Sequence, residues 1–275
     1  MKIQQTQGLL IYLGGIDMWT KDEIQILKNN YSNLYIEDLM NLLPGRTQNS
    51  IFLKANKLGL KRKNIDSRSR RKYNFNYNYF ENIDTPNKAY YLGWALTDGN
   101  VSNTQYRIRL QKEDIDILEK FSKDINSDYP IYDRNNYQNK ELVLSHKKVV
   151  DDLYKLGCYP NKTFTIEFPN IEEKYYWDFI KGLFDGDGCY ICTDKTHKIG
   201  FISASEKLIN KLSNILKEFG INQTPYKSNE HNYYRLEISS KKGMKIFLSN
   251  ILNTTSDFLD RKYNKMIALN EYINS

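Results

Sequence analysis

Two Asp-Gly pairs are the residues of this 275-residue chain whose types and setting best suit catalysis. Asp98-Gly99 closes the apolar run KAYYLGWALTDGNV, and Asp187-Gly188 closes YYWDFIKGLFDGDGCY, 89 residues further on. Each run has the apolar content of a buried helix, which places each aspartate at a helix C-terminus. A carboxylate there faces the negative end of the helix dipole and is disfavoured by about 0.3–1 kcal/mol. Repeating this arrangement predicts a compensating cation.

The second expectation is that the two carboxylates converge. Gly93 and Gly182 hold equivalent places in the two runs and allow two helices to pack closely, which brings Asp98 and Asp187 to one end. Oxygen ligands of this kind suit Mg²⁺ or Mn²⁺. Such ions activate a water and neutralise the charge on a leaving oxygen, so the pair predicts metal-assisted hydrolysis of phosphodiesters, with one aspartate serving each strand.

An internal duplication supplies the elements that position these aspartates. Each Asp-Gly is followed by the order strand, strand, helix, strand, strand, helix, and LVLSHKK overlays LEISSKK near the end of the copies. The first copy spans 85–168 and the second 169–275. The expected helices after the Asp-Gly pairs are 113–125, 147–156, 206–219 and 241–252. The expected strands are GNVS, YRIRLQ, PIYDR, ELVLS, CYICTD, KIGFISA, TPYKS and YYRLEIS. The fold class is α+β.

Alternation along the strands predicts one buried face and one exposed face. In YRIRLQ the apolar side chains alternate with Arg107, Arg109 and Gln111, and in the second copy Tyr233 and Arg235 occupy the polar face. Arginine pairs with guanine and glutamine with adenine in a major groove, so these residues, with Arg134, are candidate DNA contacts. The alternative is an exposed sheet with scattered charge.

A separate helical module is expected over 18–63. Thr20 and Glu23 form a capping box for a first helix, YIEDLMNLL predicts a second, and Thr47 caps a third that ends at Gly59. The polar residues of the third helix and its flanks are candidate DNA contacts. They are Arg46, Gln48, Asn49, Lys54, Lys57, Lys61 and Arg62.

This module resembles Myb/SANT-like helix-turn-helix domains in its tryptophan, its helix lengths and its PGRT turn. The resemblance implies DNA contact, and the alternatives are a three-helix bundle with a solvated basic face or a protein-binding SANT domain. Residues 64–84 are interpreted as a linker whose basic part is either a groove-binding arm or a tether, with Phe75, Tyr79 and Phe80 docked on the second module. Residues 1–17 are expected to be a non-structural extension, with translation starting at Met18.

The duplicated region resembles LAGLIDADG homing endonucleases. YLGWALTDG and IKGLFDGDG are similar to the two signatures of that family, and the likeness covers about residues 75–275. The resemblance implies the duplicated αββαββα fold in its single-chain, pseudo-twofold form. It further implies a monomer that cleaves double-stranded DNA at a specific site with Mg²⁺ or Mn²⁺.

The resemblance also assigns roles at the site. It implies metal ligation by Asp98 and Asp187, with the backbone carbonyls of Thr97 and Gly186 as further ligands. It implies one basic catalytic residue per copy, and we assign Lys147 and Lys241, which follow the fourth strand of each copy; the alternative is an ordinary first-turn lysine. One departure is that Leu96 stands where the second copy has Asp185, so Asp185 is interpreted as structural.

Composition limits the remaining classes of function. Forty Lys and Arg against 33 Asp and Glu give a net charge of +7, which favours a polyanionic partner. Three cysteines and three histidines exclude a disulfide scaffold and zinc-finger chemistry, and no apolar run is long enough to span a membrane. We expect a protein of the cytoplasm of a bacterial or phage-infected cell. Two other functions stay open: a DNA-binding regulator on a degenerate nuclease scaffold, and an RNA-splicing maturase.

Overall fold

The computed structural model describes residues 19–62, 73–193, 196–229 and 231–274. The chain divides into two units, residues 1–71 and residues 72–275. The predicted extension 1–17 and the basic run 63–72 lie outside the described residues. No helix among the described residues has the length and apolar content needed to cross a membrane.

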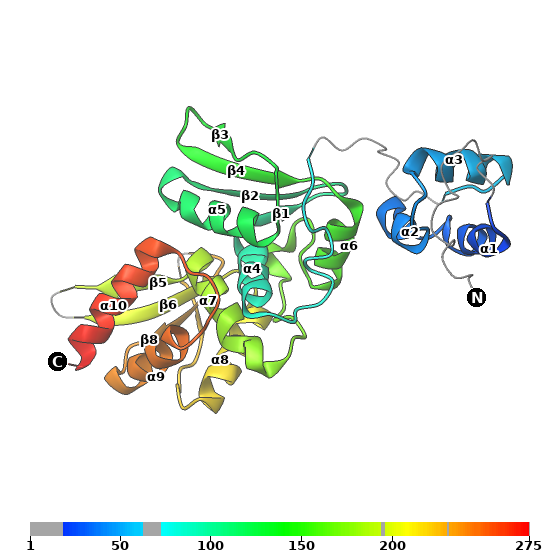
Figure 1. Cartoon of the computed structure of the whole chain (residues 1–275). Helices are drawn as coiled ribbons and strands as arrows, with labels where there is room; N and C mark the ends of the chain where they lie inside the picture. The colour runs from blue at the N-terminus through cyan, green and yellow to red at the C-terminus, as the bar shows by residue number, and fades with distance from the viewer. Residues whose placement is uncertain (1–18, 63–72, 194–195, 230, 275) are drawn as a thin grey trace, which may run out of the picture. The chain divides into compact units, whose positions relative to one another are not determined.

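Three short helices make up the described part of the first unit (Figure 1). They are α1 (Lys21–Asn30), α2 (Ile36–Leu42) and α3 (Gln48–Lys57). The capping box of Thr20 and Glu23 is present, and the Thr47 hydroxyl accepts a hydrogen bond from Ser50 N. The core contains Trp19, Leu27, Leu39, Ile51 and Ala55. The predicted three-helix module is therefore confirmed as a fold.

The second unit contains the two predicted repeats. The first comprises α4 (Pro86–Thr97), β1 (Gly99–Val101), β2 (Tyr106–Gln111), η1 (Lys112–Asp114), α5 (Ile115–Asp124), β3 (Tyr132–Arg134), β4 (Asn139–Leu144) and α6 (Lys147–Lys155). The second comprises α7 (Tyr176–Asp187), β5 (Cys189–Cys192), β6 (His197–Ser203), α8 (Glu206–Glu218), β7 (Tyr226–Lys227), β8 (Tyr234–Ile238) and α9 (Lys241–Leu252). The 3₁₀ turns η2 (Lys162–Phe164) and η3 (Glu173–Tyr175) lie between them.

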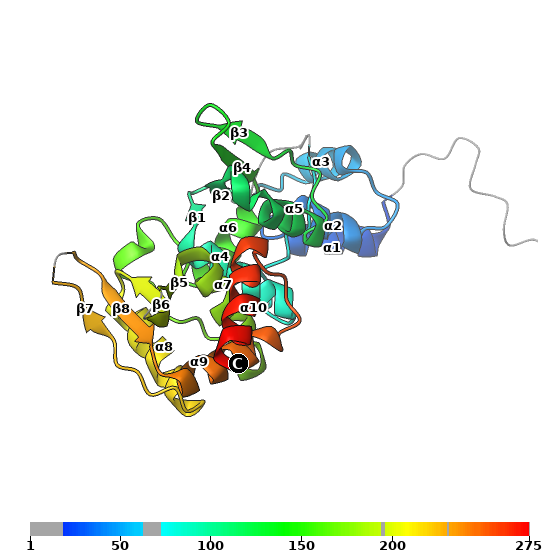
Figure 2. The ribbon, with the colours of Figure 1, turned by 90° about the vertical axis from the view of Figure 1, so that its left-hand side faces the viewer.

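Each repeat folds into a four-stranded antiparallel sheet. The strand orders, β1-β2-β4-β3 and β5-β6-β8-β7, are equivalent under the duplication. The alternation predicts the faces correctly: Tyr106, Ile108 and Leu110 are buried, as are Leu236 and Ile238. Helix α5 packs on the first sheet and α8 on the second, while α4 and α7 run side by side at the centre (Figures 1 and 2).

Two parts of the second unit differ from expectation. Helix α10 (Asp260–Asn274) follows the second repeat, where the sequence pattern indicated no element. Phe75, Tyr79 and Phe80 are buried in the core of the unit, as expected, so residues 73–84 belong to it. The aromatic half of the predicted linker 64–84 is therefore part of the second unit, because its side chains are buried in the core of that unit.

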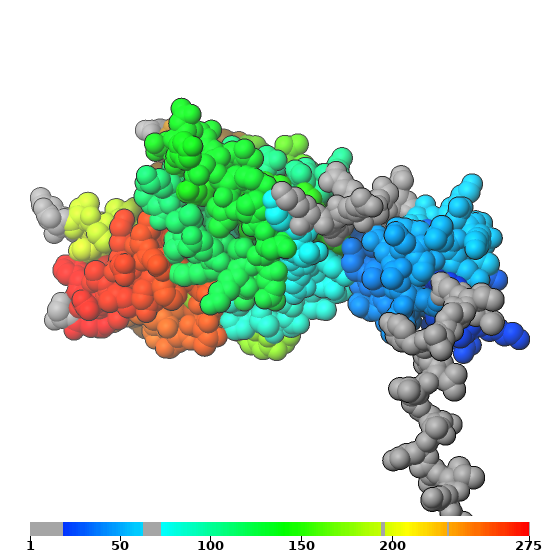
Figure 3. All heavy atoms as spheres, turned by 45° about the horizontal axis from the view of Figure 1, so that its top comes forward, coloured from blue at the N-terminus to red at the C-terminus, as the bar shows by residue number. Residues whose placement is uncertain are grey.

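The C-terminal segment joins the two repeats. Lys120 Nζ on α5 donates to Asp260 Oδ1 at 2.6 Å and to the Phe258 carbonyl at 2.8 Å. Arg261 forms an ion pair with Asp114, which is almost fully buried. In Figure 3 the green surface of the first repeat meets the red surface of α10. These contacts hold the start of α10, which follows the second repeat in the chain, against the first repeat.

Candidate active site

The close packing of α4 and α7 brings the two Asp-Gly pairs together. A Cβ on Gly182 would lie 2.0 Å from Tyr90 O, and one on Gly93 would lie 2.6 Å from Leu183 N. At the far end, a Cβ on Gly186 would lie 2.1 Å from Thr97 Oγ1. Only glycine permits such contact between backbones. The expected convergence of the two helix ends is therefore confirmed.

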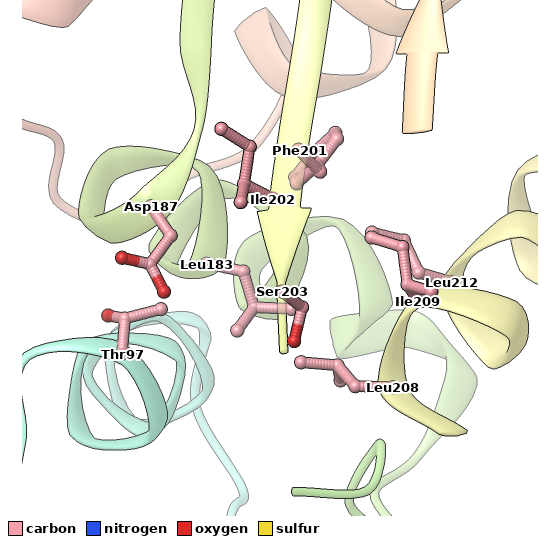
Figure 4. Close-up of a pocket in the computed structure, with 9 residues that line it drawn as sticks. All are labelled: Thr97, Leu183, Asp187, Phe201, Ile202, Ser203, Leu208, Ile209 and Leu212. Atoms are coloured by element: carbon pink, nitrogen blue, oxygen red, sulfur yellow. The ribbon is translucent and has the colours of Figure 1, made fainter. Parts of the chain in front are cut away.

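Asp98 and Asp187 both have raised pKa values, and the charge of Asp187 contributes to the shift of Asp98. Both residues are exposed by surface area. The protein atoms around each carboxylate nevertheless displace part of its hydration shell. Burial, followed by the negative charge of Asp187, raises the pKa of Asp98 to about 6. Burial also raises the pKa of Asp187, against the opposing effect of Lys262 and Lys162. In Figure 4 the Asp187 carboxylate points toward the Thr97 side chain.

Two buried lysines supply the cations that the helix ends require. Lys162 Nζ donates to the carbonyl of Gly99 at 2.5 Å, and Lys262 Nζ donates to the carbonyl of Gly188 at 2.7 Å. Each lysine thus binds the residue that follows the aspartate of one repeat, so the two lysines are equivalent under the duplication. Positive charge at a helix C-terminus offsets the dipole that disfavours Asp98 and Asp187.

The two lysines differ in how many carbonyls they bind. Lys262 also donates to Phe184 O and Asp185 O, both at 2.7 Å, and to Gly186 O at 3.3 Å. Burial lowers the pKa of Lys262 to about 8. The C-terminal end of α7 therefore carries its own bound ammonium group. The Gly186 carbonyl, an expected metal ligand, already has a donor.

The lysines assigned from the sequence lie elsewhere. Lys147 forms an ion pair with Asp151 in the first turn of α6. Lys241 is exposed at the start of α9, in a pocket lined by Met244 and Tyr272. Within the described ranges no hydrogen bond or ion pair joins Lys147 or Lys241 to Asp98 or Asp187, whereas the charges of Lys162 and Lys262 both act on the pKa of Asp187. Lys162 follows α6 and Lys262 follows α9, so a lysine soon after the last helix of each repeat was the sequence signal that could have identified this pair.

The extra acidic residue of the second motif is structural, as expected. Asp185 is buried, and its Oδ2 accepts hydrogen bonds from Tyr90 OH at 2.7 Å and from Leu259 N at 2.9 Å. Burial raises its pKa to about 6. Its counterpart Leu96 is buried in the core. Asp185 thus ties the start of the C-terminal segment to α4.

The donors at the helix ends are oxygen atoms, which fit a hard divalent cation. They are the carboxylates of Asp98 and Asp187 and the nearby carbonyls. Among the residues described, no group of three or more acidic, histidine or cysteine side chains is arranged to hold a metal ion. The arrangement is therefore a carboxylate pair, and not a cage built from side chains.

The polar face of the first sheet carries its predicted residues together with one that was missed. Arg109 and Gln111 are exposed and Arg107 is half-buried. Glu141, on the same face, is only 1% exposed and contacts Arg107, Arg109 and Arg134. Its position in ELVLS, directly opposite Arg109, was the signal that could have identified it.

The second sheet has a different arrangement on its polar face. Arg235 donates to Tyr233 OH at 2.8 Å and lies 3.7 Å from Glu237 Oε1. Lys198 Nζ donates to the same glutamate at 2.8 Å. The two sheets therefore offer different charge patterns on equivalent faces.

In the N-terminal unit the structure corrects two expected contacts. Arg46 donates to Glu23 at 2.7 Å and lies over the Trp19 ring, with its side chain 15% exposed. Arg62 donates to the Leu34 carbonyl and lies over the ring of Tyr31. Both arginines thus hold the helices together. The remaining candidates stay exposed or half-exposed: Gln48, Asn49, Lys54, Lys57 and Lys61.

Comparisons with known proteins give one family match and one curated relative. Residues 174–252 match the family described as LAGLIDADG-like domain. The replication factor C small subunit of Methanocaldococcus jannaschii is 26% identical over 176 residues, which cover 59% of this chain. The chain spans only about 9% of the length of that relative.

Solved structures resemble the second unit in fold. The LAGLIDADG meganuclease I-AabMI bound to uncleaved DNA aligns with a TM-score of 0.50 and 11% identity, over 69% of this chain and 91% of that one. I-DmoI in complex with DNA and Ca aligns with a TM-score of 0.49 and 18% identity, over 71% and 99%. Residues 174–252 therefore match a LAGLIDADG-like domain, and the duplicated unit resembles LAGLIDADG homing endonucleases in fold.

Proposed function

We propose that this protein is a site-specific double-strand DNA endonuclease that hydrolyses phosphodiester bonds with a divalent metal ion. The observation that carries the proposal is the meeting of two Asp-Gly helix ends, each with a buried lysine on its glycine carbonyl. Paired carboxylates with raised pKa values are typical of functional sites. The comparisons support the same class, since the solved relatives include complexes with DNA and with Mg, Mn or Ca.

Asp98 and Asp187 would hold Mg²⁺ or Mn²⁺, with help from the Thr97 carbonyl. A bound ion would lower the pKa of a water and neutralise charge on the leaving oxygen. The pseudo-twofold relation of the repeats supports one aspartate for each strand. Lys162 and Lys262 would fix the carbonyls beside the aspartates and attract the phosphate backbone toward them.

The polar faces of the two sheets would bind the duplex. Arg107, Arg109, Gln111 and Arg134 would contact one half of the site, and Tyr233 and Arg235 the other. The N-terminal unit would add affinity through Asn49, Lys57 and Lys61, because cations near phosphates release counterions from DNA. A single chain with both repeats would act as a monomer.

Cleavage of a randomised duplex library tests this function. The protein incubated with Mg²⁺ should cut a small set of sequences on both strands, and EDTA should abolish the cuts. Binding without cutting would favour a DNA-binding regulator. Binding to intron RNA in preference to duplex DNA would favour an RNA-splicing maturase. Either result would overturn the endonuclease proposal.

A further inference from the structure

Glu141 is a buried carboxylate in the middle of a face that otherwise projects cations. It lies in register with Arg109 on β2 and with Tyr132 on β3. Arg107 and Arg134 reach it along the two diagonals of the sheet. A carboxylate buried without partners is strongly destabilising, so its burial depends on these guanidinium groups.

Hydrogen bonds to Glu141 fix Arg109 and Arg134 by one edge, whereas Arg107 is held by the ion pair alone, since its Nε is buried without a hydrogen-bond partner. Arg134 Nε donates to Oε2 at 2.7 Å, and Arg107 Nε lies 3.4 Å from Oε1. Arg109 donates from Nε at 3.0 Å and from Nη2 at 2.7 Å, both to Oε1. For Arg107 and Arg134 the two terminal nitrogens are left for another acceptor. The arginine side chains remain 39%, 42% and 45% exposed for Arg107, Arg109 and Arg134.

Charge and hydrogen bonding keep Glu141 ionised. Burial alone would raise its pKa, but hydrogen bonds from Arg134 and Arg109 hold the pKa below its usual value. Three guanidinium groups against one carboxylate leave the cluster with a net charge of +2. The cluster therefore attracts a polyanion and also holds its donors in set directions.

The equivalent place in the second repeat is built differently. Arg109 and Glu141 face each other across the first sheet, and the same register in the second sheet pairs Ile202 with Arg235. Glu237 instead contacts one arginine and one lysine. The triple-arginine cluster thus belongs to the first repeat alone.

We propose that Glu141 is a positioning residue that aligns Arg107, Arg109 and Arg134 before DNA binds, so that the first repeat selects guanine in its half-site. A guanidinium fork with two free N–H groups matches the O6 and N7 acceptors of guanine. Alignment before binding removes the entropy cost of ordering long side chains in the complex. This inference rests on the proposed function.

The test compares Glu141→Gln with the matched control Glu237→Gln. The wild-type protein is first used with Mg²⁺ to select its target from a randomised duplex library. Arg134→Lys, which keeps the charge but loses the fork, then identifies the positions read by the first repeat. Glu141→Gln should lower guanine discrimination at the same positions by roughly 5- to 100-fold. Glu237→Gln should leave those positions unchanged.

Salt dependence separates positioning from a simple loss of folding. Because Glu141→Gln frees one positive charge, binding to non-cognate duplex should tighten, and the slope of log affinity against log salt should steepen by about one. A misfolded variant would instead bind every duplex sequence with lower affinity than wild type. Unchanged guanine preference in Glu141→Gln would overturn the inference. A wild-type protein that neither binds nor cuts duplex DNA would instead overturn the proposed function itself.

Discussion

The two repeats share a topology but differ in how each stabilises its helix end. In the first, Lys162 donates to the Gly99 carbonyl, and Leu96 packs in the core. In the second, Lys262 donates to four carbonyls, and Asp185 accepts hydrogen bonds from Tyr90 and Leu259. Both copies therefore have the aspartate and one lysine. The second copy also has a polar network that anchors the C-terminal segment.

The largest expected effect comes from the contact that the repeats share. Gly182→Ala should destabilise the protein by about 3 kcal/mol or more, because the added Cβ would lie 2.0 Å from Tyr90 O and neither backbone can yield easily. Gly93→Ala should cost a similar amount. Chemical denaturation measures both. Gly200→Ala, whose Cβ would lie 3.1 Å from the movable Cys189 Sγ and 3.9 Å from Cys189 O, is the control and should change stability little.

The lysines provide the next test. Lys162→Met and Lys262→Met should each lower the cleavage rate about 100-fold, since each removes the positive charge beside the aspartates. Lys262→Met should also lower the unfolding temperature more than Lys162→Met does, because four carbonyls lose their donor instead of one. Lys147→Met and Lys241→Met are matched controls that should cut within a few-fold of wild type. A loss of cleavage confined to Lys147→Met and Lys241→Met would restore the assignment made from sequence.

Asp185→Leu makes the second motif match the first at this position. We expect a loss of about 2–3 kcal/mol in the free energy of unfolding, because Tyr90 OH and Leu259 N lose a buried acceptor. The converse change, Leu96→Asp, should also destabilise, since it buries an unpaired charge. Thermal unfolding followed by circular dichroism measures both. If Asp185→Leu unfolds with the same free energy as wild type, the hydrogen bonds of Asp185 do not stabilise the second repeat.

The smallest expected effect concerns the raised pKa of Asp98, which burial and then the negative charge of Asp187 cause. The pKa of Asp98 in the folded protein, about 6, is above its ordinary value of 3.8, so the folded state prefers the protonated form. In EDTA at pH 7, Asp98→Asn should therefore stabilise the protein, by up to about 1 kcal/mol after solvent screening. The gain should shrink as pH falls through 6 and vanish below about 4. Equal stability of Asp98→Asn and wild type at pH 7 would argue against a raised pKa of Asp98.

Local patterns predicted the framework well, because alternation and capping are encoded by adjacent residues. Thr20 and Thr47 cap helices as expected, and YRIRLQ buries the predicted face. The close helix pair could also be predicted, since Gly93 and Gly182 recur at equivalent positions of the duplication.

Long-range contacts explain what sequence patterns missed. Lys162 and Lys262 lie outside the regular elements or at their edge, and only the folded chain brings them to Gly99 and Gly188. Arg46 looked exposed on a polar face until Glu23, from another helix, accounted for its charge. Glu141 looked like an ordinary strand residue because its burial depends on arginines from the two neighbouring strands, β2 and β3.

The most direct measurement of the central claim is strand-resolved cleavage of the selected duplex by Asp98→Asn and Asp187→Asn in Mg²⁺. Each variant should bind the duplex within a few-fold of wild type. Each should lose double-strand cleavage by on the order of 1,000-fold, because one member of the carboxylate pair can no longer hold a cation. If either variant cuts both strands at the wild-type rate, the paired aspartates are not the catalytic site.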